Sequence, residues 1–165
     1  MADLTIRPAT AADLPAINAI YNHYVSYCSS TLQDAPDTPA DRAAWFDARD
    51  PGRHPVIVAA EGDEVVGFAA LSPFKSLAGF AGCVEDTVIV RHSAQGHGIG
   101  SSLLKDLLAR AKALGHHTVI ALIAADQVGM IRLRHVNSYA DAGLLRGAAV
   151  KLGRRIDIVV MQKNL

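Results

Sequence analysis

Hydrophobic residues in the first half of the chain recur at two spacings, about 3.6 residues and two residues. The helical spacing predicts helices over 11–25 and from Thr38-Pro39 to the turn at Asp50-Pro51-Gly52. Thr10 and Asp13 have the spacing of a capping box for the first helix. Short β-branched runs predict three strands, at 4–8, 54–60 and 64–71. The last two of these strands form a predicted hairpin.

After an irregular stretch over 72–82, the second half alternates strands with helices. The predicted strands are 83–90, 118–124, 139–149 and 156–162. The predicted helices are 101–114, which carries a stripe of leucines, and 128–137. This order predicts an α/β (α+β) fold in which a mixed sheet has helices on both faces. With 165 residues, one domain over 1–165 is expected.

A glycine-rich run, Gln95-Gly96-His97-Gly98-Ile99-Gly100, lies between a predicted strand and the helix that begins at Ser101. Glycine permits backbone conformations closed to other residues, and the unpaired N–H groups of a helix start attract anions. The run therefore indicates a phosphate or pyrophosphate site. It lacks the Gly-x-Gly-x-x-Gly pattern of dinucleotide folds and the Gly-Lys-Ser/Thr of nucleoside triphosphatases. A glycine-rich turn without a ligand is the alternative.

Composition and charge narrow the choice of partners. The chain has 16 basic and 16 acidic residues, which argues against nucleic acid as the main partner. No apolar run approaches the roughly 20 residues that span a bilayer, and no secretion signal is expected in residues 1–12. Two cysteines, Cys28 and Cys83, are expected to be free thiols rather than a disulfide or metal site, as in a reducing cytoplasm.

The strand and the glycine-rich run together resemble the pyrophosphate loop of the GNAT superfamily of acetyl-coenzyme A (acetyl-CoA) dependent N-acetyltransferases. Over nearly its whole length the chain resembles the phosphinothricin / methionine sulfone (methionine sulfoximine) N-acetyltransferase branch of that superfamily. The segments that carry the resemblance are Ile6-Arg7-Pro8-Ala9, Ala12-Asp13-Leu14, Ile20-Tyr21-Asn22-His23, Ala44-Trp45-Phe46, Gly67-Phe68-Ala69, Ser72-Pro73-Phe74-Lys75, Val84-Glu85-Asp86-Thr87-Val88-Ile89-Val90 and Lys151-Leu152-Gly153-Arg154-Arg155-Ile156-Asp157. The resemblance implies a GNAT fold: a mostly antiparallel sheet of about seven strands, with a splayed cleft for acetyl-CoA.

The resemblance also implies the coenzyme contacts. Strand residues 88–90 would pair through their backbones with the pantetheine arm, which is strand addition by a ligand. The loop would hold the pyrophosphate through its N–H groups, with no metal. The expected contacts are Val88, Ile89, Val90, Gln95, Gly96, His97, Gly98, Ile99, Gly100, Ser101 and Gln127. For His97 an exposed side chain is the alternative, and Gln127 is assigned by position only.

Glu85 is the expected catalytic base. An amine must be neutral to attack a thioester, and a carboxylate in a partly apolar cleft can have a raised pKa and accept its proton. Val84 and Val88 flank Glu85 and favour such a setting. A solvated carboxylate or a salt bridge is the alternative. On a regular strand Asp86 would face the other side and be structural.

The acceptor pocket is expected in the loop before this strand. The resemblance assigns it Phe74, Lys75, Ala78, Gly79, Phe80, Glu85 and Thr87. Lys75 would pair with a substrate carboxylate or be a solvated surface lysine. Arg154 and Arg155 would bind an anion, across the interface of the homodimer that the family forms, or lie in a solvated turn.

One stretch departs from the family pattern of Asn-x-x-Ser followed by Leu-His or Leu-Tyr. Gln127 takes the place of the Asn, Met130 that of the Ser, and Arg134 that of the His or Tyr that would act as general acid. An arginine cannot give up a proton at a useful pH. His135 and Tyr139 are candidate substitutes, and a coenzyme thiolate could also leave without an acid.

The expected function is transfer of acetyl from acetyl-CoA to the primary amine of a small amino-acid analogue in a ternary complex. Phosphinothricin, methionine sulfone and methionine sulfoximine are the typical acceptors of the family. Two alternatives stay open: a non-catalytic acetyl-CoA-binding module, and an acetyltransferase that acts on a protein N-terminus or lysine.

Overall fold

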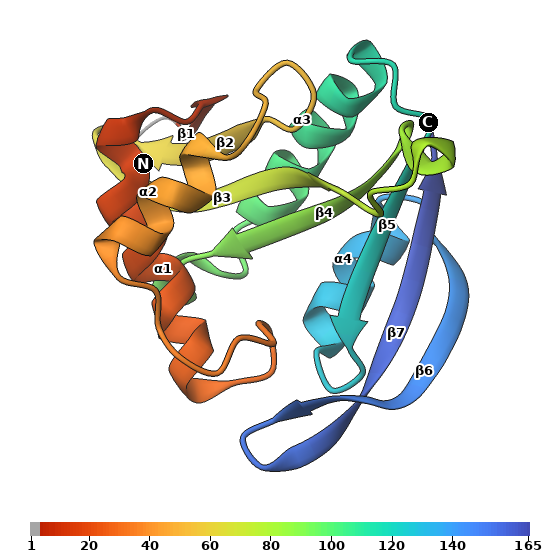
Figure 1. Cartoon of the computed structure of the whole chain (residues 1–165). Helices are drawn as coiled ribbons and strands as arrows, with labels where there is room; N and C mark the ends of the chain where they lie inside the picture. Colours follow the sequence, from red (N-terminus) through yellow and green to blue (C-terminus); the bar gives the residue numbers. More distant parts are fainter. Residues whose placement is uncertain (1–3) are drawn as a thin grey trace.

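The computed structural model describes residues 4–165, so the first three residues of the stretch expected to carry no secretion signal lie outside it. Seven strands form one sheet in the order β1-β2-β3-β4-β5-β7-β6 (Figure 1). The strands are β1 (Leu4–Pro8), β2 (Val56–Glu61), β3 (Glu64–Pro73), β4 (Cys83–Val90), β5 (Thr118–Ala124), β6 (Ala140–Lys151) and β7 (Arg154–Asn164). All pairs are antiparallel except β4 with β5. The predicted mixed, mostly antiparallel seven-stranded sheet is confirmed.

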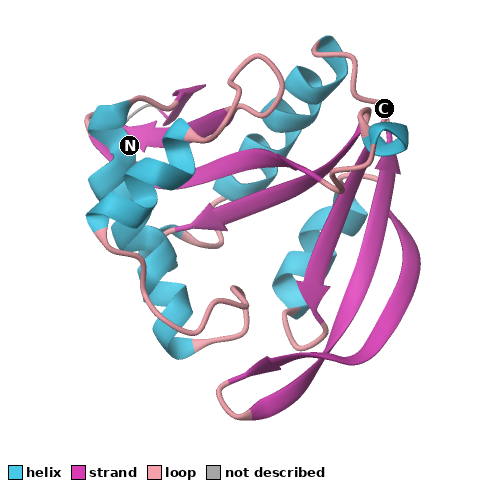
Figure 2. Ribbon diagram, viewed as in Figure 1, coloured by secondary structure: helices cyan, strands magenta, loops and turns pink. Residues whose placement is uncertain are grey.

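Helices cover both faces of the sheet (Figure 2). They are α1 (Leu14–Tyr27), α2 (Pro39–Asp47), α3 (Ile99–Ala113) and α4 (Val128–Val136). Three short 3-10 turns are η1 (Ala11–Asp13), η2 (Ala78–Phe80) and η3 (His92–Ala94). Capping boxes precede both N-terminal helical segments, one from Thr10 and Asp13 and one from Thr38 and Asp41. These boxes fix where the two segments begin.

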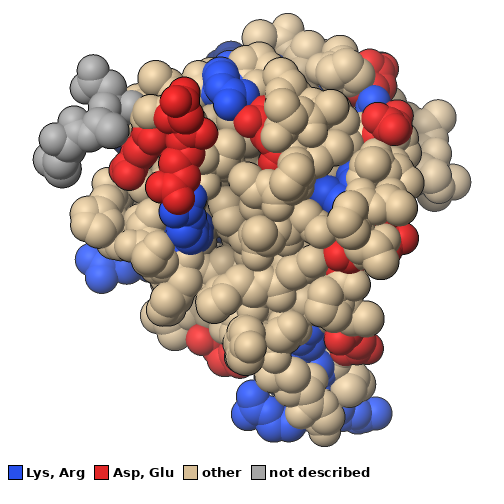
Figure 3. Space-filling view, turned by 90° about the vertical axis from the view of Figure 1, so that its left-hand side faces the viewer, with Lys and Arg blue, Asp and Glu red and all other residues tan. Residues whose placement is uncertain are grey.

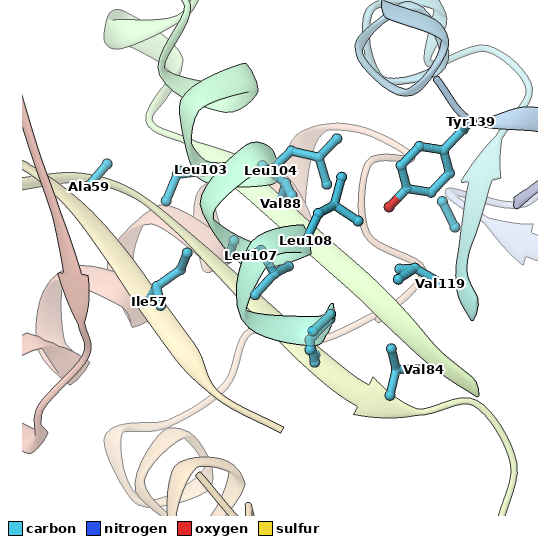
Figure 4. Close-up of a cluster of buried hydrophobic side chains, with 14 of the residues drawn as sticks. Ile57, Ala59, Val84, Val88, Leu103, Leu104, Leu107, Leu108, Val119 and Tyr139 are labelled. Atoms are coloured by element: carbon cyan, nitrogen blue, oxygen red, sulfur yellow. The ribbon is translucent and has the colours of Figure 1, made fainter. Parts of the chain in front are cut away.

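The larger core lies between the sheet and the helices α3 and α4, which cover one of its faces. The leucine stripe of α3, at positions 103, 104, 107 and 108, packs on β-branched and alanine residues of β2, β3, β4 and β5 (Figure 4). Met130, Ile131 and Leu133 of α4 pack against the same core. The even-numbered residues Val84 and Val88 of β4 therefore point to this side.

The smaller core lies on the opposite face, under α1 and α2. Ile17, Ile20 and Tyr24 of α1 pack on Phe68 of β3 and Ile89 of β4, with Trp45 and Phe46 of α2 at the rim. The odd-numbered residues of β4 thus face α1 and α2. Because the β3–β4 pairing is continuous from Val90 to Val84, no bulge interrupts this alternation.

The structure corrects several boundaries. The first predicted helix is a 3-10 turn followed by α1, and β2 begins at Val56 rather than at 54 because Arg53 and His54 close a turn on the Asp50 carbonyl. β3 continues two residues further than predicted, to Pro73, in its pairing with β4. The predicted strand at 118–124 is parallel to β4 and antiparallel to β7.

Candidate active site

The sheet splits between β4 and β5. These strands pair only at Cys83, Val84 and Glu85, opposite 118–120. Beyond this point β4 stays with β3 and β5 stays with β7, so the two strands diverge (Figure 1). The backbone of β4 past Glu85 therefore has an edge that no strand of the described chain occupies on the β5 side.

A cavity of about 590 Å³ occupies the open part of the split. It has the size of small-molecule sites in proteins. The residues that line it are Tyr24, Ser30, Val88, Ile89, Val90, Ala94, Gln95, Gly96, Gly98, Ile99, Gly100, Ser101, Asp126, Gln127, Val128, Gly129, Met130 and Leu133. The structure thus brings together every expected coenzyme contact except His97.

The glycine loop presents the start of α3 to this cavity. Gly96 has φ +84° and Gly98, the N-cap of α3, has φ +82°. A Cβ at either position would meet no atom within 4 Å, so glycine is required by the backbone conformation and not by crowding. The unpaired N–H groups and the positive end of the α3 dipole can hold a phosphate here.

Two side chains of this loop make contacts within the protein. The Gln95 amide donates to the Tyr24 hydroxyl at 2.7 Å, and that hydroxyl donates to the Val90 carbonyl at 2.6 Å. Tyr24 thereby ties α1 to the end of β4 and to the loop. His97 is exposed and its Nδ1 lies 3.4 Å from the Ala94 carbonyl oxygen. Sequence reasoning missed Tyr24 because helical spacing marks it only as a core residue.

Glu85 is half-buried on the α1/α2 face, at the point where β4 and β5 part. Burial raises the pKa of its carboxyl, and the negative charge of Asp86 adds to this effect. Lys75 acts in the opposite direction and lowers this pKa. Glu85 does not line the 590 Å³ cavity, so the candidate base lies outside the pocket that the expected coenzyme contacts form.

The loop before β4 places part of the expected acceptor pocket near Glu85. Lys75 is close enough to act on the Glu85 charge, and its Nζ lies 5.4 Å from the centre of the Phe74 ring. The rings of Phe74 and Phe80 pack edge to face with centroids 5.7 Å apart. Ala78, Gly79 and Phe80 form the exposed turn η2. Thr87 is on the same face of β4 as Glu85.

Asp86, Arg134 and Tyr139 form a buried group on the opposite face, here called the Asp86 network. The Arg134 guanidinium pairs with one carboxylate oxygen of Asp86, and the Tyr139 hydroxyl donates to the other at 2.6 Å. Burial and the Asp86 charge raise the pKa of Tyr139 far above its ordinary value. His135 is exposed and lies 2.9 Å from Asp141. Neither candidate substitute for the general acid lines the cavity.

A second polar group, here called the clasp, connects the two sides of the split at its open end. Ser29 donates to Asp126 at 2.5 Å, Ser30 donates to the Gln127 side-chain oxygen at 2.7 Å, and the Gln127 amide donates to Ser29 at 2.8 Å. Gln127 lines the cavity, but its side chain is engaged by these serines. The clasp joins the loop after α1 to the turn between β5 and α4.

The β6–β7 hairpin supports the same loop. The Lys151 side chain is 1 % exposed, and its ammonium group donates to the carbonyls of Val25, at 2.7 Å, and Gln33. Sequence reasoning missed this role because Lys151 stands in a polar turn. Arg154 and Arg155 are exposed, in keeping with the cationic side chains at the lower end of the molecule in Figure 3.

Within residues 4–165, no three His, Cys, Asp or Glu residues are grouped as metal ligands would be. No helix in that part of the chain is both long and apolar enough to cross a membrane. Cys28 and Cys83 are free, as expected.

Comparisons with known proteins give the family of the chain. The model of the acetyltransferase (GNAT) family matches residues 17–135. An L-methionine sulfoximine/L-methionine sulfone acetyltransferase of Pseudomonas paraeruginosa is 38% identical, over 98% of this chain and 94% of its own. A phosphinothricin N-acetyltransferase of Streptomyces viridochromogenes is 35% identical, over 96% of this chain and 86% of its own.

Solved structures agree with the sequence comparison. The structure of yncA from Salmonella typhimurium with its cofactor acetyl-CoA superposes with a TM-score of 0.94 at 35% identity, covering 98% of this chain and 94% of that one. The split sheet and the glycine loop of this chain are thus found on a fold that holds acetyl-CoA. The chain belongs to the acetyltransferase (GNAT) family and is an acetyl-CoA-dependent N-acetyltransferase.

Proposed function

We propose that this enzyme acetylates the primary amine of a small amino-acid-like acceptor of the methionine sulfone, methionine sulfoximine or phosphinothricin type. The observation that carries the proposal is the position of Glu85, half-buried on the α1/α2 face where β4 and β5 part, with a raised pKa. The names of the similar enzymes support this choice of acceptor. The reaction is a direct attack in a ternary complex, within a single domain over residues 1–165.

The residues of the split fit acetyl-CoA, which supplies the thioester-bound acetyl group. The loop 95–101 offers N–H groups at a helix start to the pyrophosphate. The free edge of β4 at 88–90 offers backbone groups to an extended arm, as a missing strand would use them. Gln127 borders the same space, and His97 stands at its rim, outside the cavity lining.

Glu85 takes the proton of the acceptor ammonium group. Because burial and Asp86 raise its pKa, the carboxylate is a better proton acceptor than a solvated glutamate. A backbone N–H of the free β4 edge stabilises the oxyanion of the tetrahedral intermediate. The leaving thiolate needs no strong acid because a thiol pKa is about 8.5, as for cysteine. This agrees with the burial of Tyr139 and the exposure of His135 away from the cavity.

The acceptor contacts are those next to Glu85. Lys75 pairs with the carboxylate of the acceptor, Thr87 donates a hydrogen bond to it, and the rings of Phe74 and Phe80 with the turn Ala78-Gly79 border its side chain. The proposal is supported by the position of Lys75, which is near enough to Glu85 to lower the pKa of its carboxyl.

The enzyme is further proposed to be a cytoplasmic homodimer that binds neither nucleic acid nor membranes. The two free thiols fit a reducing compartment. The balance of 16 basic and 16 acidic residues gives no general attraction to nucleic acid. β6 exposes Leu144, Leu145 and Val150 along an edge of the sheet, as a face covered by a second copy would.

The test is release of free coenzyme A thiol from acetyl-CoA with a panel of acceptors, run on the wild type and on Glu85→Gln. The panel contains phosphinothricin, methionine sulfone, methionine sulfoximine, free amino acids and a peptide with a free N-terminus. We expect turnover with one of the analogues and a loss of about 10²-fold or more in Glu85→Gln, largest at low pH where the amine is protonated.

The matched control is Glu61→Gln, which removes an exposed carboxylate at the end of β2 and should leave the rate unchanged. Coenzyme binding without turnover of any amine would contradict the proposal and favour a binding module. Turnover of the peptide alone would favour a macromolecular acceptor.

A further inference from the structure

The Asp86 network lies on the face of β4 opposite to Glu85, and Asp86 is the next residue of that strand. Glu85 is the last residue of β4 that pairs with β5, and Asp86 is the first residue past that pairing. The side chains of Arg134 and Asp86 are 2% and 0% exposed. Figure 4 shows the Tyr139 ring at the edge of the larger core, with its hydroxyl turned inward. One buried carboxylate is thus held by one cation and one phenol.

Stability alone does not favour this arrangement. Nε and Nη1 of Arg134 are buried and have no hydrogen-bond partner within residues 4–165. A buried donor without a partner costs about 1–3 kcal/mol, and apolar residues often replace a buried ion pair without loss. Such costs are typical of residues that serve a function.

The charges around Glu85 are few. Asp86 acts on it along β4, and Lys75 acts on it from the loop before β4. Its neighbour on β3 is Ser72, which accepts a hydrogen bond from Arg49 of the turn after α2, and its neighbour on β5 is the apolar Ile120. Arg134 is the cation that pairs with Asp86, so it offsets part of the negative charge by which Asp86 raises the pKa of Glu85.

We propose that Arg134 is a positioning residue for acetyl transfer: by holding Asp86 in an ion pair behind β4, it sets how readily Glu85 takes and releases a proton. This inference rests on the proposed role of Glu85 as base. Arg134 acts through Asp86 and lines neither the coenzyme cavity nor the acceptor loop. It thus takes part in proton transfer although it cannot itself act as an acid.

Replacing Asp86 and replacing Arg134 should shift the pH profile of kcat/KM in opposite directions. Asp86→Asn keeps the shape and an acceptor for Tyr139 but leaves the Arg134 charge uncompensated, so the acid limb of the kcat/KM profile should move to lower pH. Arg134→Met leaves the Asp86 carboxylate without its cation, so the acid limb should move to higher pH. Each shift should be on the order of half to one pH unit.

Arg134→Lys restores a cation and should return the limb toward that of the wild type. If Arg134→Met does not fold, the pair of Asp86→Asn and Arg134→Lys still gives the test. An acid limb that stays in place in folded Asp86→Asn would overturn the inference, as would shifts of the same sign in Asp86→Asn and Arg134→Met.

A second readout does not depend on turnover. The carboxyl carbon of Glu85 can be titrated by NMR in ¹³C-labelled wild type and Asp86→Asn, with Glu85→Gln assigning the signal. If the acetyl transfer assay fails with every acceptor, the proposed function falls, and this titration still decides whether the Asp86 network governs Glu85.

Discussion

Two polar bridges cross the split sheet, and they differ in depth. The Asp86 network lies at the closed end, with the Asp86 and Arg134 side chains at most 2% exposed, and joins β4 to α4 and to Tyr139 just before β6. The clasp lies at the open end and joins the loop after α1 to the β5–α4 turn through four side chains, of which only Ser29 is fully buried. The cavity proposed to bind acetyl-CoA is lined by Ser30, Asp126 and Gln127 of the clasp and by no residue of the Asp86 network.

The difference in burial predicts that the closed end is harder to open than the open end. An ion pair with charged hydrogen bonds in a buried setting is costly to break because the charge left behind has no partner. The clasp combines two neutral hydrogen bonds with two to the exposed Asp126 carboxylate, and water can replace each neutral bond at a net cost of about 1 kcal/mol. The closed end therefore holds the two halves of the sheet in register, while the open end can release a ligand.

The largest expected effect is on the closed end. Arg134→Met should lower the free energy of unfolding by about 3–5 kcal/mol because it leaves the Asp86 carboxylate buried without a cation. Chemical denaturation followed by circular dichroism measures the change. The companion variant is the triple replacement Asp86→Leu, Arg134→Met and Tyr139→Phe, which removes every polar atom of the network and should recover most of the loss. A triple variant as unstable as Arg134→Met would show that packing, not charge, explains the effect.

The sequence predicted the parts of this site that depend on local backbone chemistry. The glycine spacing before an amphipathic helix predicted the loop because it is written in consecutive residues, whereas the free edge at Val88-Ile89-Val90 was expected from the family resemblance. The order of strands and helices predicted the sheet. The face of Asp86 also followed from simple alternation, since β4 has no bulge.

The two bridges could not be predicted in this way. Ser29 and Asp126 are 97 residues apart in sequence, and Asp86 and Tyr139 are 53 apart. No local pattern distinguishes such pairs from solvated polar residues. Arg134 stands out only as a departure from the family pattern, and its pairing with Asp86 explains why an arginine is accommodated at a buried position.

A third ionic contact, between Arg7 and Asp13 at the rim of the smaller core, is intermediate in burial between the Asp86 network and the clasp. Asp13 is buried, whereas Arg7 of β1 is 44% exposed. The Arg7 hydrogen bonds, with those from Thr10, lower the pKa of Asp13 from 3.8 to about 2 against the effect of burial. A carboxyl whose pKa is lowered by folding stabilises the fold above its unfolded pKa, and this contribution disappears as pH falls through the folded pKa.

Asp13 should therefore stabilise the protein by about 2 kcal/mol at neutral pH, a contribution lost between about pH 4 and pH 2. Denaturation midpoints over this range, compared with those of Asp13→Asn, measure it. The difference between the two proteins should shrink as the pH falls. A difference that stays constant down to pH 2 would mean that the carboxylate charge contributes nothing and that only the capping geometry matters.

Breaking the clasp should have the smallest effect on stability, although it should speed the exchange of ligand. Gln127→Ala removes the hydrogen bonds to Ser29 and Ser30 and should cost about 1 kcal/mol, because water can reach the serines. Hydrogen exchange should nevertheless rise in the loop 28–38, and acetyl-CoA should dissociate faster, since the clasp residues border its cavity.

Ser30→Ala is the matched variant from the other side of the same bond. If the clasp is one unit, the double variant should dissociate no faster than Gln127→Ala alone. Additive effects on dissociation would mean that each side chain contacts the ligand separately, and the open end would then be held by the ligand rather than by the clasp.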